Sequence, residues 1–144
     1  MIGIGVLVSG SGSNLQAIMD ACETGEIDGR VAVVVSNVEG AYALERARMK
    51  GIPTHVLSHR NRPDRVAFDE ALADILESHH VDLVALAGFM RVLTPAFLRR
   101  FPGRIMNIHP ALLPAFPGLH VRQKALDHGV RFSGCTVHFV DEGV

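Results

Sequence analysis

The chain has 144 residues, of which 48% are hydrophobic and 20% are charged, with 14 Lys and Arg against 15 Asp and Glu. This length predicts a single domain that buries roughly 68–70% of its unfolded surface, and the hydrophobic fraction excludes a disordered chain. The net charge of −1 argues against a general nucleic-acid binder, so we expect an anionic ligand to be bound by a few local donors.

The first part of the chain alternates apolar strands with amphipathic helices. Ile2–Val8 is a continuous apolar run, typical of a strand covered on both faces. Apolar residues recur at helical spacing over Leu15–Cys22, and the β-branched run Val31–Val35 predicts a second buried strand. Ala41–Lys50 is rich in good helix formers and is followed by Gly51, which predicts a helix with a glycine at its C-terminal end.

The remaining predicted elements continue this alternation. In chain order they are a strand at Thr54–Leu57, a helix from Phe68 to Ser78, a strand at Leu83–Ala87, a short helix opened by Thr94 and Pro95, a strand at Ile105–Ile108, a helix at Gln123–His128 and a strand at Thr136–Val140. Repeated strand–helix–strand units indicate one α/β domain with a doubly wound, mostly parallel sheet, whose ligands bind at the strand ends. No apolar stretch reaches the roughly 20 residues that span a bilayer, so we expect a cytoplasmic protein with no membrane partner.

The loop at Ser9–Asn14 holds three serines, two glycines and an asparagine. Its glycines allow the backbone to turn tightly, and the free N–H groups at the start of the following helix suit a phosphate. The loop is not a P-loop because no Lys-Ser/Thr follows, and Leu15 occupies the third glycine position of a dinucleotide motif. A purely structural turn is the alternative, but the composition favours a cradle for a single phosphate.

Asn107 and His109 occupy alternate positions at the end of the predicted strand Ile105–Ile108, so they point to the same side of it. An amide N–H can stabilise an oxyanion while an imidazole moves a proton near neutral pH, and this pair therefore favours acyl transfer. The alternative is that Asn107 only ties the strand to the next loop and His109 caps it.

The segment Gly88–Leu93 follows another predicted strand and carries four apolar side chains around Arg91. It predicts an apolar slot for a flat heteroaromatic ligand, with Arg91 as a charge contact at the rim. Alternatively, these residues belong to the core and Arg91 is a solvated loop charge. We expect the acidic pair Asp69–Glu70 to lie on a solvated helix face.

Several segments occur in the order found in the phosphoribosylglycinamide formyltransferase family, the GAR transformylases of purine biosynthesis, and the sequence resembles that family over essentially its whole length. These segments are Ser9–Ile18, Ala87–Leu93, Asn107–Pro114, Phe116–His120 and Gly134–Val140. The resemblance implies a single formyltransferase domain over residues 1–144 with a Rossmann-like fold.

The resemblance also implies a reaction and its residues. A formyl group would pass from 10-formyltetrahydrofolate to the amine of phosphoribosylglycinamide, in a monomer or homodimer and without a metal. Gly12, Ser13 and Asn14 would hold the phosphoribosyl end of the substrate. Asn107 would stabilise the oxyanion, and His109 would be the proton donor. The residues implied on the folate side are Arg65, Met90, Arg91, Val92, Leu93 and Asn107.

The chain departs from the family pattern in two places. Ala111 and Ala115 stand in the proline-rich loop where the family often has Ser and Lys. The family also has an Asp directly after the segment that here ends at Val144, so the resemblance implies that the C-terminal part of the domain is missing. Two alternatives stay open, namely a formyltetrahydrofolate deformylase, which passes formyl to water, and a non-catalytic module that binds a phosphoribosyl or folate group.

Overall fold

The computed structural model describes residues 1–58, 64–110 and 135–139, with side chains for 1–58 and 64–108. These residues form one sheet with the strand order β3-β2-β1-β4-β5-β6. The strands are β1 (Ile2–Val8), β2 (Gly29–Ser36), β3 (Thr54–Val56), β4 (Leu83–Leu86), β5 (Ile105–Pro110) and β6 (Cys135–Phe139). All neighbours pair in parallel except β5 and β6, which are antiparallel.

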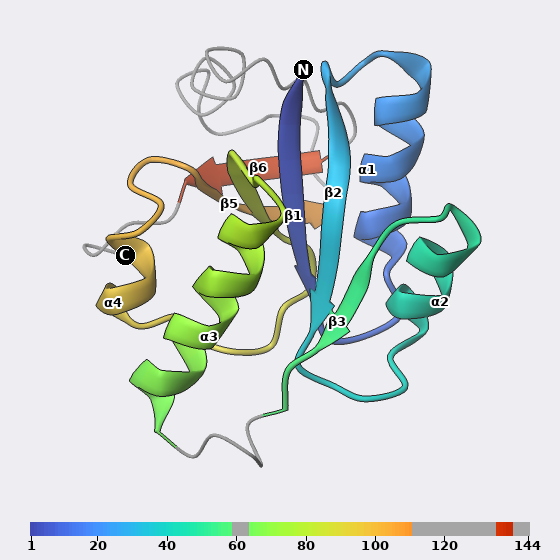
Figure 1. Cartoon of the computed structure of the whole chain (residues 1–144). Helices are drawn as coiled ribbons and strands as arrows, with labels where there is room; N and C mark the ends of the chain where they lie inside the picture. The colour runs from blue at the N-terminus through green and yellow to red at the C-terminus, as the bar shows by residue number, and fades with distance from the viewer. Residues whose placement is uncertain (59–63, 111–134, 140–144) are drawn as a thin grey trace.

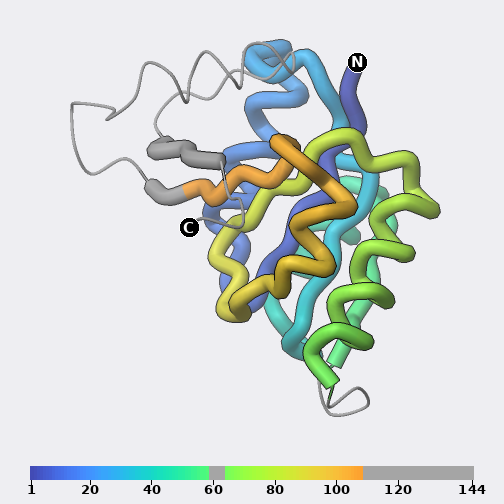
Figure 2. Tube along the Cα trace, turned by 90° about the vertical axis from the view of Figure 1, so that its left-hand side faces the viewer, coloured from blue at the N-terminus to red at the C-terminus, as the bar shows by residue number. Residues whose placement is uncertain are grey.

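Helices cover both faces of this sheet (Figure 1). The helices α1 (Ser13–Thr24) and α2 (Tyr42–Met49) lie on one face, and α3 (Arg65–Ser78) and α4 (Pro95–Leu98) lie on the other. Figure 2 turns this second face toward the viewer, with α3 (green) at the right and α4 (gold) nearer the middle. This arrangement confirms the predicted doubly wound, mostly parallel sheet. None of the helices in residues 1–58 and 64–110 is long and apolar enough to cross a membrane.

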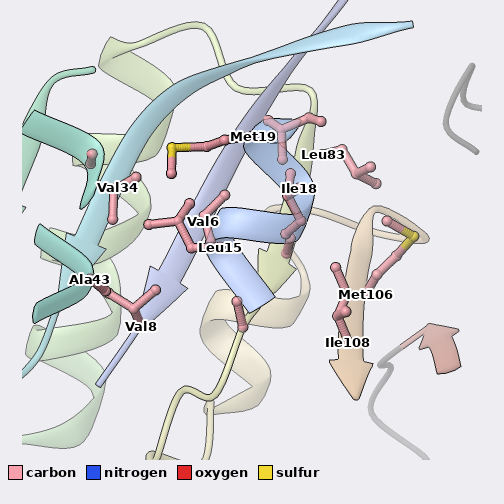
Figure 3. Close-up of a cluster of buried hydrophobic side chains, with 14 of the residues drawn as sticks. Val6, Val8, Leu15, Ile18, Met19, Val34, Ala43, Leu83, Met106 and Ile108 are labelled. Atoms are coloured by element: carbon pink, nitrogen blue, oxygen red, sulfur yellow. The ribbon is translucent and has the colours of Figure 1, made fainter. Parts of the chain in front are cut away.

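Successive side chains of each strand point to opposite faces of the sheet, and this alternation divides the core into two apolar clusters. Figure 3 shows the cluster beneath α1 and α2, to which β1 contributes Val6 and Val8 and helix α1 contributes Leu15. The neighbouring Leu7 points the other way, into the cluster beneath α3 and α4. Both faces of β1 are therefore buried, which explains why its sequence is apolar at nearly every position rather than at every second one.

The strand order reverses direction at β1. The chain moves from β1 to β2 and β3 on one side, then returns to place β4 and β5 on the other side. The loops that follow β1 and β4 consequently leave neighbouring strands in opposite directions, which opens a crevice at the carboxyl ends of those strands. In open α/β sheets, ligands generally bind at such a switch point.

Asp69 corrects one sequence-based expectation, because it is fully buried whereas Glu70 is exposed. One oxygen of the Asp69 carboxylate, Oδ2, accepts hydrogen bonds from the backbone N–H and the hydroxyl of Thr94, at 2.6 and 2.7 Å. A buried carboxylate needs such donors to offset its lost hydration, and the sequence gives no sign of this distant partner. The predicted helix at Gln123–His128 and the last residue of the predicted strand, Val140, lie outside the described residues.

Helix α3 begins with a side-chain cap, which generates a stability prediction. Asp64 is the N-cap residue, and its Oδ1 accepts the backbone N–H of Val66 at 3.0 Å. We expect Asp64→Ala to lower the free energy of unfolding by about 1 kcal/mol, because the first turn of the helix loses its acceptor. Asp64→Asn keeps an acceptor and is the matched control. Urea titrations that give equal stabilities for the two variants would contradict this account.

Candidate active site

A cavity of about 290 Å³ opens at the switch point between β1 and β4. Its walls come from the loop after β1, the first residues of α1, and the segment after β4. The lining residues are Ser9, Gly10, Ser11, Gly12, Ser13, Asn14, Ala87, Gly88 and Met90. The structure therefore brings together two of the segments that the sequence singled out separately, and it places them around one space.

Gly12 is the N-cap of α1 and has a φ of +83°, in the left-handed region that favours glycine. A Cβ atom at this position would lie 2.7 Å from both the Cα and the Cβ of Ala43 in α2. The loop thus turns directly against α2, and this close approach excludes any side chain. Both the backbone conformation of Gly12 and its close approach to Ala43 therefore require a glycine at this position.

Two carbonyl groups of the loop accept hydrogen bonds from residues of α2. The Gly10 carbonyl accepts the backbone N–H of Ala43 at 3.1 Å, and the Ser11 carbonyl accepts Nε of Arg46 at 2.7 Å. These acceptors therefore point toward α2, and the first turn of α1 holds no acidic side chain. An anion entering the cavity meets N–H groups and serine hydroxyls, together with the positive end of the helix dipole. Sequence reasoning missed Arg46, because nothing in a helical run shows that one of its residues contacts the distant loop.

Two side chains tie the loop to three other strands. The Ser9 hydroxyl donates to Oδ1 of Asn37 after β2, and it accepts the backbone N–H of Met90 after β4 at 2.8 Å. Nδ2 of Asn14 donates to the carbonyl of Ile108 in β5 at 3.2 Å. The loop is consequently fixed to the segment after β4 and to the end of β5, where the predicted catalytic pair lies.

The segment after β4 turns apolar side chains outward and is fixed from within by α3. The side chains of Met90 and Val92 are 82% and 73% exposed. The guanidinium carbon of Arg91 lies 3.9 Å from the ring centroid of Phe68, and Nη2 of Arg65 donates to the carbonyl of Val92 at 3.4 Å. Leu93 packs against the core beneath α3. Arg65, Arg91 and Val92, all predicted on one side of the site, are thus brought together.

Asn107 lies in β5, as the sequence predicts, and β5 extends two residues beyond the predicted strand, so that it also includes His109. Asn107 is half-buried and pairs in register with Leu86 of β4 on one side and with His138 of β6 on the other. The backbone of His109 lies opposite Thr136, and its side chain is outside the described residues. The chemical roles of Asn107 and His109 therefore stay predictions.

Neither metal-ligand clusters nor a reactive thiol add to this site in the part of the chain that the structure describes. No three His, Cys, Asp or Glu side chains come together there in a way that could hold a metal ion. Cys22 is partly buried against the core, and burial, followed by the charge of Glu23, raises the pKa of its thiol to about 11. Such a thiol is a poor nucleophile at neutral pH.

The reversed strand order, the glycine-rich turn and the donor-lined cavity define an α/β protein with a cavity suited to an anionic ligand at its switch point. Comparison with known proteins gives the particular family. The profile of the family described as "Formyl transferase" matches residues 3–144. The chain belongs to the formyl transferase family.

Individual relatives agree with this assignment. Phosphoribosylglycinamide formyltransferase of Escherichia coli is 50% identical over 137 residues, which are 95% of this chain and 65% of the relative. The trifunctional purine biosynthetic protein adenosine-3 of Drosophila melanogaster is 51% identical over 143 residues, 98% of this chain and 11% of that protein. The crystal structure of glycinamide ribonucleotide transformylase 1 from Symbiobacterium toebii superposes with a TM-score of 0.80 at 58% identity, covering all of this chain and 68% of that one. The chain therefore spans about a tenth of the fly protein and about two thirds of the bacterial ones.

The close approach of Gly12 to Ala43 predicts that alanine substitutions at two glycines of the same loop have different effects on stability. Gly12→Ala should lower the free energy of unfolding by about 2 kcal/mol or more, because the new Cβ is strained in its backbone conformation and overlaps α2. Gly10→Ala is the matched control, since a Cβ there meets nothing within 4 Å, and its effect should stay within about 0.5 kcal/mol. Urea unfolding measures both, and equal losses would refute the close contact.

Proposed function

We propose that this protein transfers a formyl group from 10-formyltetrahydrofolate to the amine of phosphoribosylglycinamide, as a cytoplasmic enzyme of purine biosynthesis. The observation that carries the proposal is the donor-lined cavity at the switch point of a chain that belongs to the formyl transferase family. The names of its relatives supply the acceptor, because those at about 50% identity are phosphoribosylglycinamide formyltransferases and related purine biosynthetic proteins.

The loop after β1 suits the phosphoribosyl end of the acceptor. Gly12 and Ser13 begin α1, where free N–H groups and the helix dipole favour a phosphate without any basic side chain in the lining. Asn14 bonds to the carbonyl of Ile108, so a substrate bound by the loop would lie close to the end of β5. A phosphorylated acceptor is thereby favoured over water, the acceptor of a deformylase.

The segment after β4 suits formylfolate. Met90 and Val92 present apolar surface beside the cavity, as a flat heteroaromatic ring system requires. Arg65 and Arg91 lie on the α3 side of the same segment and supply positive charge for the carboxylates of a folate. Leu93 packs into the core beneath this surface, and we assign it a supporting position in the folate site.

The chemistry requires one nucleophilic addition and one elimination. The glycinamide nitrogen attacks the formyl carbon and forms a new C–N bond, and the carbonyl oxygen becomes an oxyanion. The side-chain amide of Asn107 would donate to this oxyanion. The bond from the formyl carbon to the folate nitrogen then breaks, and the His109 imidazolium would give a proton to that nitrogen. As that bond breaks, the oxyanion re-forms the carbonyl, and the attacking nitrogen loses its extra proton to water, which balances the reaction and yields formylated phosphoribosylglycinamide and tetrahydrofolate.

A direct assay tests the proposal. Purified protein is incubated with 10-formyltetrahydrofolate, with and without phosphoribosylglycinamide, and both formylated product and free formate are measured. We expect formylated product that requires the phosphoribosyl acceptor. Formate release without an acceptor would instead indicate a deformylase, and binding of both ligands without turnover would indicate a non-catalytic module.

Variants of the proposed catalytic pair separate chemistry from binding. Asn107→Ala should lower kcat by about 100-fold, because one oxyanion donor is lost. His109→Ala should lower kcat by about 100- to 10,000-fold, because the leaving nitrogen loses its proton donor. The Kd for phosphoribosylglycinamide, measured by calorimetry, should change little in either variant. Wild-type turnover in His109→Ala would refute its role as the proton donor.

A further inference from the structure

Asp69 is a charged side chain held entirely inside the protein at the boundary between α3 and the segment after β4. Its Oδ2 accepts both the N–H and the hydroxyl of Thr94, while Oδ1 is buried and has no hydrogen-bond partner among the described residues. Burying a carboxylate is costly, and a well-packed apolar side chain is often at least as stabilising. Stability alone therefore does not explain a carboxylate at this position. Its two hydrogen bonds to Thr94 explain it as a group that holds Thr94 in place.

The residue before Asp69 holds the same segment at a second point. Phe68 lies beneath the guanidinium of Arg91, at 3.9 Å from ring centroid to guanidinium carbon. Nε of Arg91 is buried without a hydrogen-bond partner among the described residues, and the guanidinium stacks on the Phe68 ring. Consecutive residues of one helix thus fix Arg91 and Thr94.

Two further hydrogen bonds fix the backbone of the same segment, at Met90 and at Val92. The hydroxyl of Ser9 accepts the N–H of Met90, and Arg65 donates to the carbonyl of Val92. The side chains of Met90 and Val92 nevertheless stay 82% and 73% exposed. An untethered segment would lower its free energy by turning such side chains inward. The hydrogen bonds to its backbone therefore hold an apolar surface open.

We propose that Asp69 is a positioning residue for formylfolate, acting through Thr94 to hold the Met90–Leu93 segment in its binding conformation. This inference rests on the proposed function. Asp69 itself need not touch the ligand, because it is buried behind the segment. A segment that is already ordered loses little conformational entropy when the ligand binds, and preorganisation of this kind therefore strengthens binding.

The test uses Thr94→Val, which keeps the side-chain shape and the backbone N–H but removes the hydroxyl donor. Thr94→Ser keeps the hydroxyl and is the matched control. Calorimetry gives the Kd of each variant for 10-formyltetrahydrofolate and for phosphoribosylglycinamide. We expect Thr94→Val to weaken formylfolate binding by about fivefold or more, with less than about a twofold change for the phosphoribosyl ligand, and Thr94→Ser to retain near wild-type affinity.

Asp69→Asn provides an independent variant, because a neutral amide accepts weaker hydrogen bonds from Thr94 than a carboxylate does. It should shift the Kd for formylfolate in the same direction as Thr94→Val while urea unfolding stays cooperative. An unchanged Kd for formylfolate in both variants, or equal weakening of both ligands, would overturn the positioning role. If the wild-type protein binds no formylfolate, the proposed function itself fails, and the two failures are distinguishable.

Discussion

The structure depends on the parallel pairing of β1 with β2 on one edge and with β4 on the other. This pairing places β1 inside the sheet, where helices bury both of its faces, and it sets β1 beside β4, whose following loop leaves toward the opposite face. The cavity follows from that reversal, because the loops after β1 and β4 diverge where the strands end. The proposed contacts with substrates come from these two loops, from the first residues of α1 and α3, and from the end of β5.

Much of this architecture could be predicted from the sequence, because parallel strands that are buried on both faces have continuous apolar sequences. The prediction for Ile2–Val8 matches β1 at both ends, and the alternation with amphipathic helices identified the doubly wound sheet. The position of the loop that lines the cavity could also be predicted, since glycines and polar residues directly after a buried strand lie at the carboxyl edge of the sheet, whereas the binding roles of its residues stay predictions. Predictions of this kind depend only on the type of each residue and on its neighbours in the chain.

Partners from distant segments could not be predicted in the same way. Asp69 was expected in solvent because an acidic pair on a helix is usually solvated, yet its face of α3 meets the donors of Thr94. The contribution of Arg46 was missed for the same reason, since its bond to the Ser11 carbonyl exists only when α2 packs on the loop. Local patterns specify which elements form, whereas tertiary packing decides which of their polar groups meet.

The lining of the cavity carries one further consequence. Its described residues are serines, glycines, an alanine, a methionine and an asparagine, and none of these side chains titrates near neutral pH. The dipole of α1 contributes a positive potential at its first residues, and the strength of this dipole does not change when protons are gained or lost. If the phosphoribosyl group binds here as proposed, the pH dependence of its binding would follow the second ionisation of the phosphate, which lies near neutrality, rather than the titration of a side chain in this lining.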